Sequence, residues 1–422
     1  MAVLNNVNYI AAKTYSGIGW KLNRPACIFW LCLIGILFLP PLLKQAILGG
    51  NGSFFNPFFV AAFILCLAPR KLRGVTIAEL VMLFCVVFLC VVAVYSNLSA
   101  GYSVYSCFKA FLTLNFPLVL LIVWRSLIFK ESWMLQALKI FNWVVLFLFV
   151  WAIVNAMLSG ALVDSLARFA QGLVDIKNLD RLWSPYGHPL YNAALFLAFF
   201  CLNTVAAKRG HRLMPVWVVL LVPALGLLLC ASKSAFLIFL VLILLWYATD
   251  VRWALLVISF GVILFAFGGF DLIASRFSQG ISSGRFETWD LLGRMDILRP
   301  FGFMSGYGIS STFNLYDEQL AWASSAFEFP VLGYSLSYGI AYTIVLYAIM
   351  FLYPIVIMVK SKEWIILATF IAVGLHMNSY NGLFLVSDYF AIFVFFTVVL
   401  MQLTKTKQSA RNRETANGGA NK

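Results

Sequence analysis

Arginine, lysine and histidine recur in the loops that separate long apolar segments, beside glycine, proline and serine. Arg181 and His188 come just before an apolar run that begins at Pro189, and Lys233 lies in the short turn Ala-Ser-Lys-Ser between two further runs. A guanidinium binds phosphate through two parallel hydrogen bonds, and an ammonium adds a point charge. These residues predict an anion site. The alternatives are that Arg181 pairs with loop acids, His188 only begins a helix and Lys233 anchors a helix end.

A second group of residues falls in and after the longest polar loop. Arg285 and Trp289 are four residues apart and share one face if the stretch is helical, and Tyr307 stands in a Gly-Tyr-Gly sequence where the backbone can turn sharply or approach a ligand closely. Glu328 precedes the apolar run that starts at residue 331. Its carboxylate is predicted to serve as a general base or sugar ligand, or to form a salt bridge with a loop arginine.

His376 belongs to a polar patch near the end of the chain, together with Asn378, Asn381 and Asp388. These side chains can hydrogen-bond to hydroxyl groups. We therefore expect His376 to line a cleft that binds sugar.

The elements that position these residues are strongly apolar. Of the 422 residues, 63% are hydrophobic and only 11% are charged, and the mean hydropathy is +0.93. Soluble domains carry about 25% charged residues, so this composition excludes a soluble enzyme and also a disordered or collagen-like chain. In lipid the backbone must satisfy its own hydrogen bonds, as helices or as a closed barrel. Long continuous apolar runs favour helices, so the sequence predicts an all-α polytopic membrane protein.

About twelve transmembrane helices are predicted, with soft ends, near residues 25–43, 54–69, 75–96, 104–124, 140–158, 189–206, 213–230, 234–249, 253–268, 331–358, 364–377 and 389–404. The predicted organisation is an N-terminal segment 1–24, helices one to nine within 25–268 with an outer loop at 159–187, a large outer loop at 269–330, helices ten to twelve within 331–404, and a disordered tail at 405–422. Loops longer than about 15 residues are usually functional or disordered.

The distribution of basic residues predicts the orientation. Twenty lysines and arginines fall in one set of alternate loops and nine in the other, while Lys109 lies inside a span. Basic residues concentrate in cytoplasmic loops, so both termini are predicted to be cytoplasmic. The net charge of +14 then reflects topology and anionic inner lipid, not nucleic-acid binding.

The cysteines and acids offer no metal or disulfide pattern. All eight cysteines lie in or beside apolar runs, and no Cys/His or acidic cluster has the spacing of a metal site. The sequence therefore predicts no disulfide framework, no metal and no cofactor.

The order of these segments resembles the bacterial O-antigen ligase and Wzy-type polysaccharide polymerase superfamily over roughly residues 180–345. The resemblance is carried by Arg181 with Gly187-His188-Pro189 and Asn192, the Ser-Lys-Ser turn at Lys233, the stretch from Arg285 to Trp289, the stretch from Pro300 to Gly308, and a polar residue before the span at Val331. It implies a C-type membrane glycosyltransferase fold, with the large periplasmic loop between helices nine and ten.

The resemblance also implies an activity. The family transfers glycan without a metal from an undecaprenyl-pyrophosphate donor to an acceptor glycan, at the periplasmic face of the bacterial inner membrane. Arg181 and Arg285 would hold the pyrophosphate, and Glu328 or His188 would supply a base. Membrane lipids and a chain-length regulator protein are the further partners implied.

Three alternatives remain open. Ligases place a His-Asn pair before the tenth span, whereas this chain has Ala-Phe-Glu ending at Glu328, which favours a polymerase over a ligase that transfers glycan to lipid A-core. A lipid-linked oligosaccharide flippase or transporter needs polar residues at mid-membrane depth on several helices, and only Glu79 and Lys109 lie clearly within predicted spans. A nonenzymatic assembly factor is the third alternative.

Overall fold

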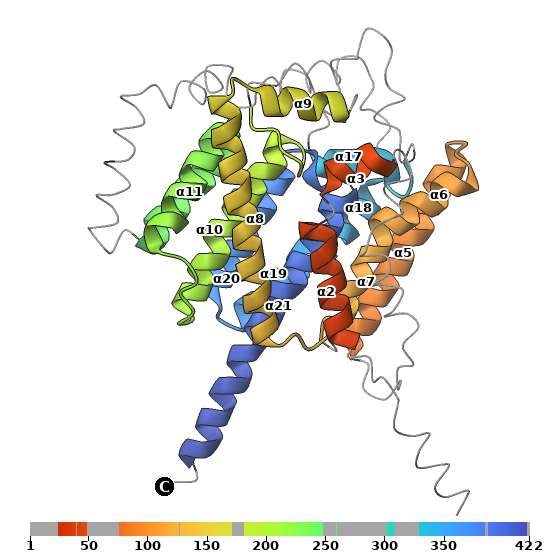
Figure 1. The fold of residues 1–422 in the computed structure, drawn as a ribbon. Coiled ribbons are helices and arrows are strands. Elements are labelled where there is room, and N and C mark those ends of the chain that lie inside the picture. Colours follow the sequence, from red (N-terminus) through yellow and green to blue (C-terminus); the bar gives the residue numbers. More distant parts are fainter. Residues whose placement is uncertain are drawn as a thin grey trace, which may run out of the picture.

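The computed structural model describes residues 24–38, 40–48, 76–125, 127–170, 181–247, 259, 302–306, 308, 329–384 and 387–419. Every regular element within these ranges is a helix (Figure 1). Among the described residues, four helices are long and apolar enough to cross a membrane: α5 (Ile77–Ser99), α8 (Glu131–Met157), α10 (Pro189–Lys208) and the continuous run Ile340–Lys360. The sequence prediction of a helical membrane protein is confirmed in this form, and the number of spans stays a prediction.

Shorter apolar helices occupy several other predicted spans. They are α2 (Arg24–Leu37), α11 (Val216–Leu229), α12 (Lys233–Tyr247), α20 (Trp364–Asn378) and the apolar segment Tyr389–Lys405 of the longer helix α21 (Ser387–Gly419). The predicted spans at 54–69 and 253–268 lie outside the described residues.

Three predicted spans are interrupted where proline or glycine breaks the helix. The span at 25–43 divides at Pro40 into α2 and α3 (Pro41–Leu48). The span at 104–124 consists of α6 (Val104–Ala110), the π-helical turn η2 (Phe111–Asn115), the 3₁₀ turn η3 (Phe116–Leu118), which contains a proline, and α7 (Val119–Val123). The span at 331–358 divides at Gly339, whose φ is +94°, into α17 (Pro330–Tyr338) and a second run of α18 (Ile340–Tyr347), η6 (Ala348–Leu352) and α19 (Tyr353–Lys360).

The corner between α17 and α18 is filled by backbone from the large predicted loop. The amides of Ile340 and Ala341 donate to the carbonyls of Gly302 (3.1 Å) and Phe303 (2.9 Å), so these two free amides of α18 are satisfied. A Cβ added to Gly306 would lie 2.4 Å from the carbonyl oxygen of Leu336. Glycine is therefore required for this backbone-to-backbone contact.

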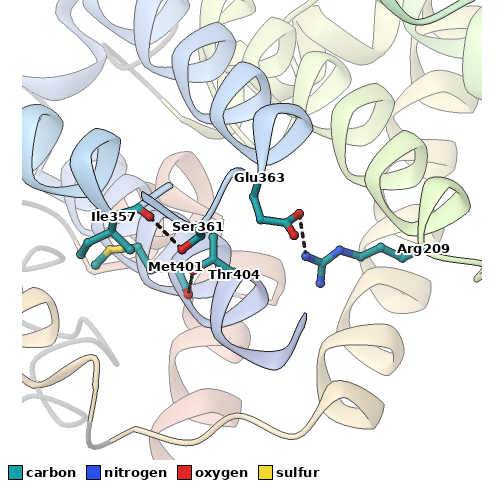
Figure 2. A network of polar contacts seen from close by, with 6 residues as sticks. All are labelled: Arg209, Ile357, Ser361, Glu363, Met401 and Thr404. Atoms are coloured by element: carbon teal, nitrogen blue, oxygen red, sulfur yellow. Dashed lines mark hydrogen bonds and ion pairs between the residues drawn. The ribbon is translucent and has the colours of Figure 1, made fainter. Parts of the chain in front are cut away.

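The helices form a bundle whose two ends are held differently. At one end lie α3, α17 and α9 (Ala161–Phe169), the last inside the predicted loop 159–187 (Figure 1). At the opposite end, Arg209 and Glu363 point toward one another and form an ion pair of 3.2 Å (Figure 2). His211 and Glu131 form a second, exposed pair of 3.1 Å there. The sequence predicts that the first end is outer and the second is cytoplasmic.

The centre of the bundle is α10, which is the most enclosed of the four long helices. It packs against α8, α11 and α20. Asn142 of α8 and Asn203 of α10 are fully buried or nearly so and exchange two amide hydrogen bonds of 2.9 and 2.8 Å. This reciprocal pair satisfies both amides inside an apolar core and fixes the register of the two helices.

The C-terminal helix α21 extends beyond the bundle as far as Gly419 (Figure 1). The sequence predicts a disordered tail at 405–422, and this stays a prediction. Lys, Gln, Arg, Ala and Glu in this stretch have high helix propensity.

Candidate functional site

The loop before α10 is folded around one buried asparagine. The Nδ2 of Asn192 donates to the carbonyls of Leu182 (2.8 Å) and Gly187 (3.3 Å), and its Oδ1 accepts from the hydroxyl of Ser184 (2.8 Å). Gly187 has φ +117°, and a Cβ there would meet the Tyr389 hydroxyl at 2.7 Å. These contacts give residues 181–188 a fixed shape.

The same loop is fastened to neighbouring elements. Tyr186 donates from its hydroxyl to the carbonyl of Leu37 at 2.5 Å, and burial raises the pKa of Tyr186 to about 12, so this donor remains protonated. The indole of Trp151 donates to the carbonyl of Trp183 at 3.0 Å. The loop is therefore bound to α2 and α8 as well as to α10.

Arg181 is held beside the turn that joins α11 to α12. Its Nε donates to the carbonyl of Cys230 at 3.0 Å, and the amide of Leu182 donates to the carbonyl of Leu229 at 3.0 Å. These bonds satisfy carbonyls at the end of α11. This bond holds the planar guanidinium, a group whose geometry matches that of phosphate, beside the α11–α12 turn.

The α11–α12 turn is tight and adopts an uncommon backbone conformation. Ala231 has φ +49°, a left-handed conformation that costs a residue with a Cβ about 1 kcal/mol or more. The chain then enters α12 at Lys233, which is half-buried. The turn thus places Lys233 three residues after the carbonyl that Arg181 contacts.

The start of α12 has the features of an anion site. The first amides of a helix have no partner within the helix, and the helix dipole favours negative charge there. Ser232, just before the helix, is 1% exposed, and its hydroxyl has no hydrogen-bond partner among the described residues. Arg181, Lys233 and the α12 N-terminus therefore provide positive charge and polar donors at one place.

His376 joins this site from α20. Its Nε2 lies 2.9 Å from the carbonyl of Leu190 and its Nδ1 lies 3.1 Å from the hydroxyl of Ser234. A carbonyl only accepts, so Nε2 carries the proton and Nδ1 accepts from Ser234. The hydroxyl of Ser379 lies 2.8 Å from that of Ser234. The structure thus links α10, α12 and α20 through one imidazole.

This arrangement changes the expected role of His376. The sequence predicts that it lines a sugar cleft, but the side chain is fully buried and both ring nitrogens have protein partners. The imidazole therefore orients the Ser234 hydroxyl beside Lys233 instead of forming a cleft wall.

His188 is the N-cap residue of α10. Its Nδ1 accepts from the amide of Leu190 at 3.2 Å, and its ring packs edge-on against Trp183, with centroids 5.0 Å apart. The structure therefore shows the alternative in which His188 begins a helix, and Nδ1 is used in the hydrogen bond that caps α10. A catalytic use of His188 would have to involve Nε2.

The structure brings four of the predicted site residues to one end of the bundle: Arg181, His188, Lys233 and His376. Arg285, Trp289, Tyr307 and Glu328 lie outside the described residues. Gly306 and Gly308, on either side of Tyr307, are described, and both meet the protein itself: Gly306 meets α17, and a Cβ at Gly308 would meet the Tyr102 ring at 2.5 Å. Close approach of backbone to protein therefore explains these two glycines.

The sequence alone does not identify two residues of the site, Ser234 in the Ser-Lys-Ser turn and Ser379 after α20. No spacing rule connects them, because Ser234 and Ser379 are 145 positions apart and meet only through helix packing. A serine next to a site lysine was the one available signal.

Within the part of the chain that the structure describes, no three His, Cys, Asp or Glu side chains are grouped as metal ligands. No protein-family model, no curated protein and no solved structure matches the chain.

Proposed function

We propose that this chain is a membrane-embedded glycosyltransferase that polymerises oligosaccharide repeat units carried on a lipid pyrophosphate. The observation that supports this proposal best is the meeting of Arg181, Lys233 and the α12 N-terminus at one end of an apolar bundle. A phosphate group on a lipid would lie at that depth, with its chain in the hydrocarbon. The sequence resemblance assigns the lipid as undecaprenyl and the face as periplasmic.

The chemistry requires little beyond positioning and positive charge. The bond from the sugar anomeric carbon to the pyrophosphate oxygen breaks, and a new bond forms from that carbon to an acceptor hydroxyl of a second glycan. The acceptor hydroxyl loses its proton to a base, for which Glu328 is the proposed residue, and lipid pyrophosphate leaves. Arg181 and Lys233 stabilise the charge that develops on this leaving group.

Ser234 has a defined place in this proposal. The Ser234 hydroxyl donates a hydrogen bond to Nδ1 of His376, which fixes its oxygen beside Lys233. We assign His376 and Ser379 as positioning residues, and Ser234 as a sugar contact, because its one proton goes to His376 and its oxygen can accept from a sugar hydroxyl. Preorganised polar groups act more strongly than groups that must reorient during reaction.

The transporter alternative depends on Glu79 and Lys109, the two charged residues within predicted spans, and the structure gives Glu79 a different role. Glu79 lies in the first turn of α5, where Thr76 and Glu79 form a capping box: the Thr76 amide donates to Oε2 of Glu79 at 2.9 Å, and the Glu79 amide donates to the Thr76 hydroxyl at 3.3 Å. A capping carboxylate at a helix start has a structural role. It does not mark a path through the membrane.

The test is the glycan profile of a strain that lacks the gene, complemented with variants. Loss of long chains, with lipid A-core still capped by single repeat units, supports the polymerase. Loss of all capping, with polymer accumulating on the lipid carrier, identifies a ligase. Loss of both polymer and capping, with single lipid-linked repeat units accumulating on the cytoplasmic side, identifies a flippase.

The complementing variants test the site itself. Arg181→Ala and Arg181→Lys should each lower the polymerisation rate by about 30- to 1000-fold, because the charge-assisted fork contributes about 2–4 kcal/mol and a point charge does not replace it. Arg168→Ala is the matched control, since Arg168 is an exposed arginine of α9 at the same end. Equal activity of Arg181→Lys and wild type, at equal protein level, would contradict the pyrophosphate role.

A further inference from the structure

A long apolar groove runs along the bundle between α2, α8, α10, α20 and α21. One wall is a single face of α10, formed by Tyr191, Ala194, Leu195, Ala198, Leu202, Val205, Ala206 and Arg209. Residues separated by three, four and seven positions share a helix face, so these residues form one continuous stripe.

Small side chains explain why this face is hollow. Ala194, Ala198 and Ala206 stand where other faces of α10 carry phenylalanine, and the walls opposite them belong to other helices, with Phe29 on α2 and Phe141 on α8. Alanine leaves space that the facing side chains do not fill. The groove therefore follows from the positions of the alanines in the α10 sequence.

The length of the groove limits what can occupy it. From Tyr191 to Arg209 the helix rises about 27 Å, which is close to the roughly 30 Å thickness of a bilayer hydrocarbon core. An acyl chain of a phospholipid stays within one leaflet, roughly half that depth. A single chain that fills the groove must cross the bilayer midplane.

The two ends of the groove have different chemistry. At one end the groove is lined by Tyr191 and Met377. These are the residues directly after Leu190 and His376, which are joined by a hydrogen bond in the candidate site. The groove therefore begins directly beside the candidate anion site. At the other end it is bounded by Glu131, Arg209 and His211, which take part in the Arg209–Glu363 ion pair and the His211–Glu131 hydrogen bond there.

We propose that this groove binds the isoprenoid chain of the lipid whose pyrophosphate is held at Arg181 and Lys233. The inference rests on the proposed function for the identity of the head group, but the groove itself rests on α10. An anion site at one end, an apolar channel of full bilayer depth and a charged far end match a long polyprenyl chain. They do not match an ordinary acyl chain.

The experiment measures lipid retention on the purified full chain by native mass spectrometry. The probes are undecaprenyl phosphate, undecaprenol, geranylgeranyl phosphate and phosphatidylethanolamine. Wild type should retain undecaprenyl phosphate at least about tenfold better than geranylgeranyl phosphate. Ala198→Phe fills the groove and should remove that preference. Ala207→Phe is the matched control, because Ala207 is exposed on another face of α10 and should change nothing.

A second variant and three contrary outcomes complete the test of the groove. If Ala198→Phe does not accumulate, Ala206→Phe blocks only the far end and should lower retention of the long chain without affecting the short one. Equal retention by the groove variants and wild type, displacement of undecaprenol by equimolar phosphatidylethanolamine, or a change of oligomeric state in Ala198→Phe would each overturn the proposal. The last result would identify a second copy of the chain as the occupant.

Undecaprenol separates this inference from the proposed function. It has no phosphate, so its binding should survive Arg181→Ala and disappear in Ala198→Phe. If Arg181→Ala has no effect on phosphate lipids while Ala198→Phe still prevents undecaprenol binding, the groove stands and the pyrophosphate site fails. If polymer is formed normally by Ala198→Phe, the site stands and the groove proposal fails.

Discussion

Arg209 and Glu363 form an ion pair of 3.2 Å between the end of α10 and the start of α20. At the far ends of the same antiparallel helices, Nε2 of His376 donates to the carbonyl of Leu190 at 2.9 Å. The helix pair is therefore joined at both ends. The first link is an ion pair with side chains only 16% and 5% exposed, and the second is a neutral hydrogen bond inside the candidate site.

The ion pair should contribute measurably to stability. Glu363→Gln leaves the guanidinium of Arg209 with a neutral partner in a largely buried place, and we expect a loss of about 1.5–3 kcal/mol in the free energy of unfolding. Thermal unfolding in detergent measures this loss. The double variant Arg209→Gln with Glu363→Gln completes the cycle and should cost less than the sum of the single variants. Additive losses would mean that the two side chains do not interact.

Two substitutions at His376 separate positioning from packing. In His376→Asn the amide oxygen takes the place of Nδ1 and can still accept from Ser234, whereas the contact with the Leu190 carbonyl is lost. In His376→Gln the amide nitrogen takes the place of Nε2, and Ser234 loses its acceptor. We expect the first variant to be less stable by about 1–3 kcal/mol but active, and the second to be stable with kcat lowered about tenfold and KM little changed.

Ser234→Ala is the control for this contrast. It should lower kcat as His376→Gln does, and the double variant should be no worse, because both remove one oriented hydroxyl. A merely structural imidazole would give the opposite pattern, with activity following protein level in every variant.

Asn192→Ala should disturb the loop that holds Arg181. The change leaves the hydroxyl of Ser184 and the carbonyls of Leu182 and Gly187 without their amide partner, which should cost about 2–4 kcal/mol. Polymerisation should fall as strongly as in Arg181→Ala. Asn155→Ala is the comparison, because the side chain of Asn155 accepts from the amide of Val163 near α9, away from Arg181, and the change should leave the rate unchanged.

The left-handed Ala231 gives a stabilising prediction. Glycine adopts this conformation without steric cost and is preferred at the position after a helix end. Ala231→Gly should therefore raise the free energy of unfolding by about 1 kcal/mol and leave catalysis unaltered. Ala235→Gly, within α12, should lower it by about 0.5–1 kcal/mol. A destabilised Ala231→Gly would show that the Ala231 methyl group has packing contacts that outweigh the backbone strain.

Chelation provides a test of the source of positive charge. Arginine and lysine can stabilise a departing pyrophosphate without a metal, so polymerisation by the purified protein should persist in EDTA. A loss of activity that added Mg²⁺ or Mn²⁺ restores would assign that charge to a cation.

The sequence was sufficient for the apolar helices because composition and run length determine them. Arg181 and Lys233 could be predicted as candidate anion ligands because basic residues directly beside apolar segments on the outer side are uncommon. The breaks at Pro40 and Gly339 were not predicted, since one residue of either kind is often tolerated in a membrane helix. The partners of His376 could not be predicted either, because they come from α10 and α12 and depend on how three helices pack.

The corner formed by Gly302, Phe303 and Gly306 on α17 and α18 has a consequence for how such proteins can diversify. Two backbone amides of α18 and the close contact at Gly306 join the large predicted loop to the α17–α18 corner. The loop and these two helices can therefore be exchanged between related proteins only as one unit. A chimera that exchanges the loop alone should misassemble, whereas one whose junction falls after Tyr347 should preserve the corner. New specificities would then arise by exchange of this combined module, with α10 and its groove left in place.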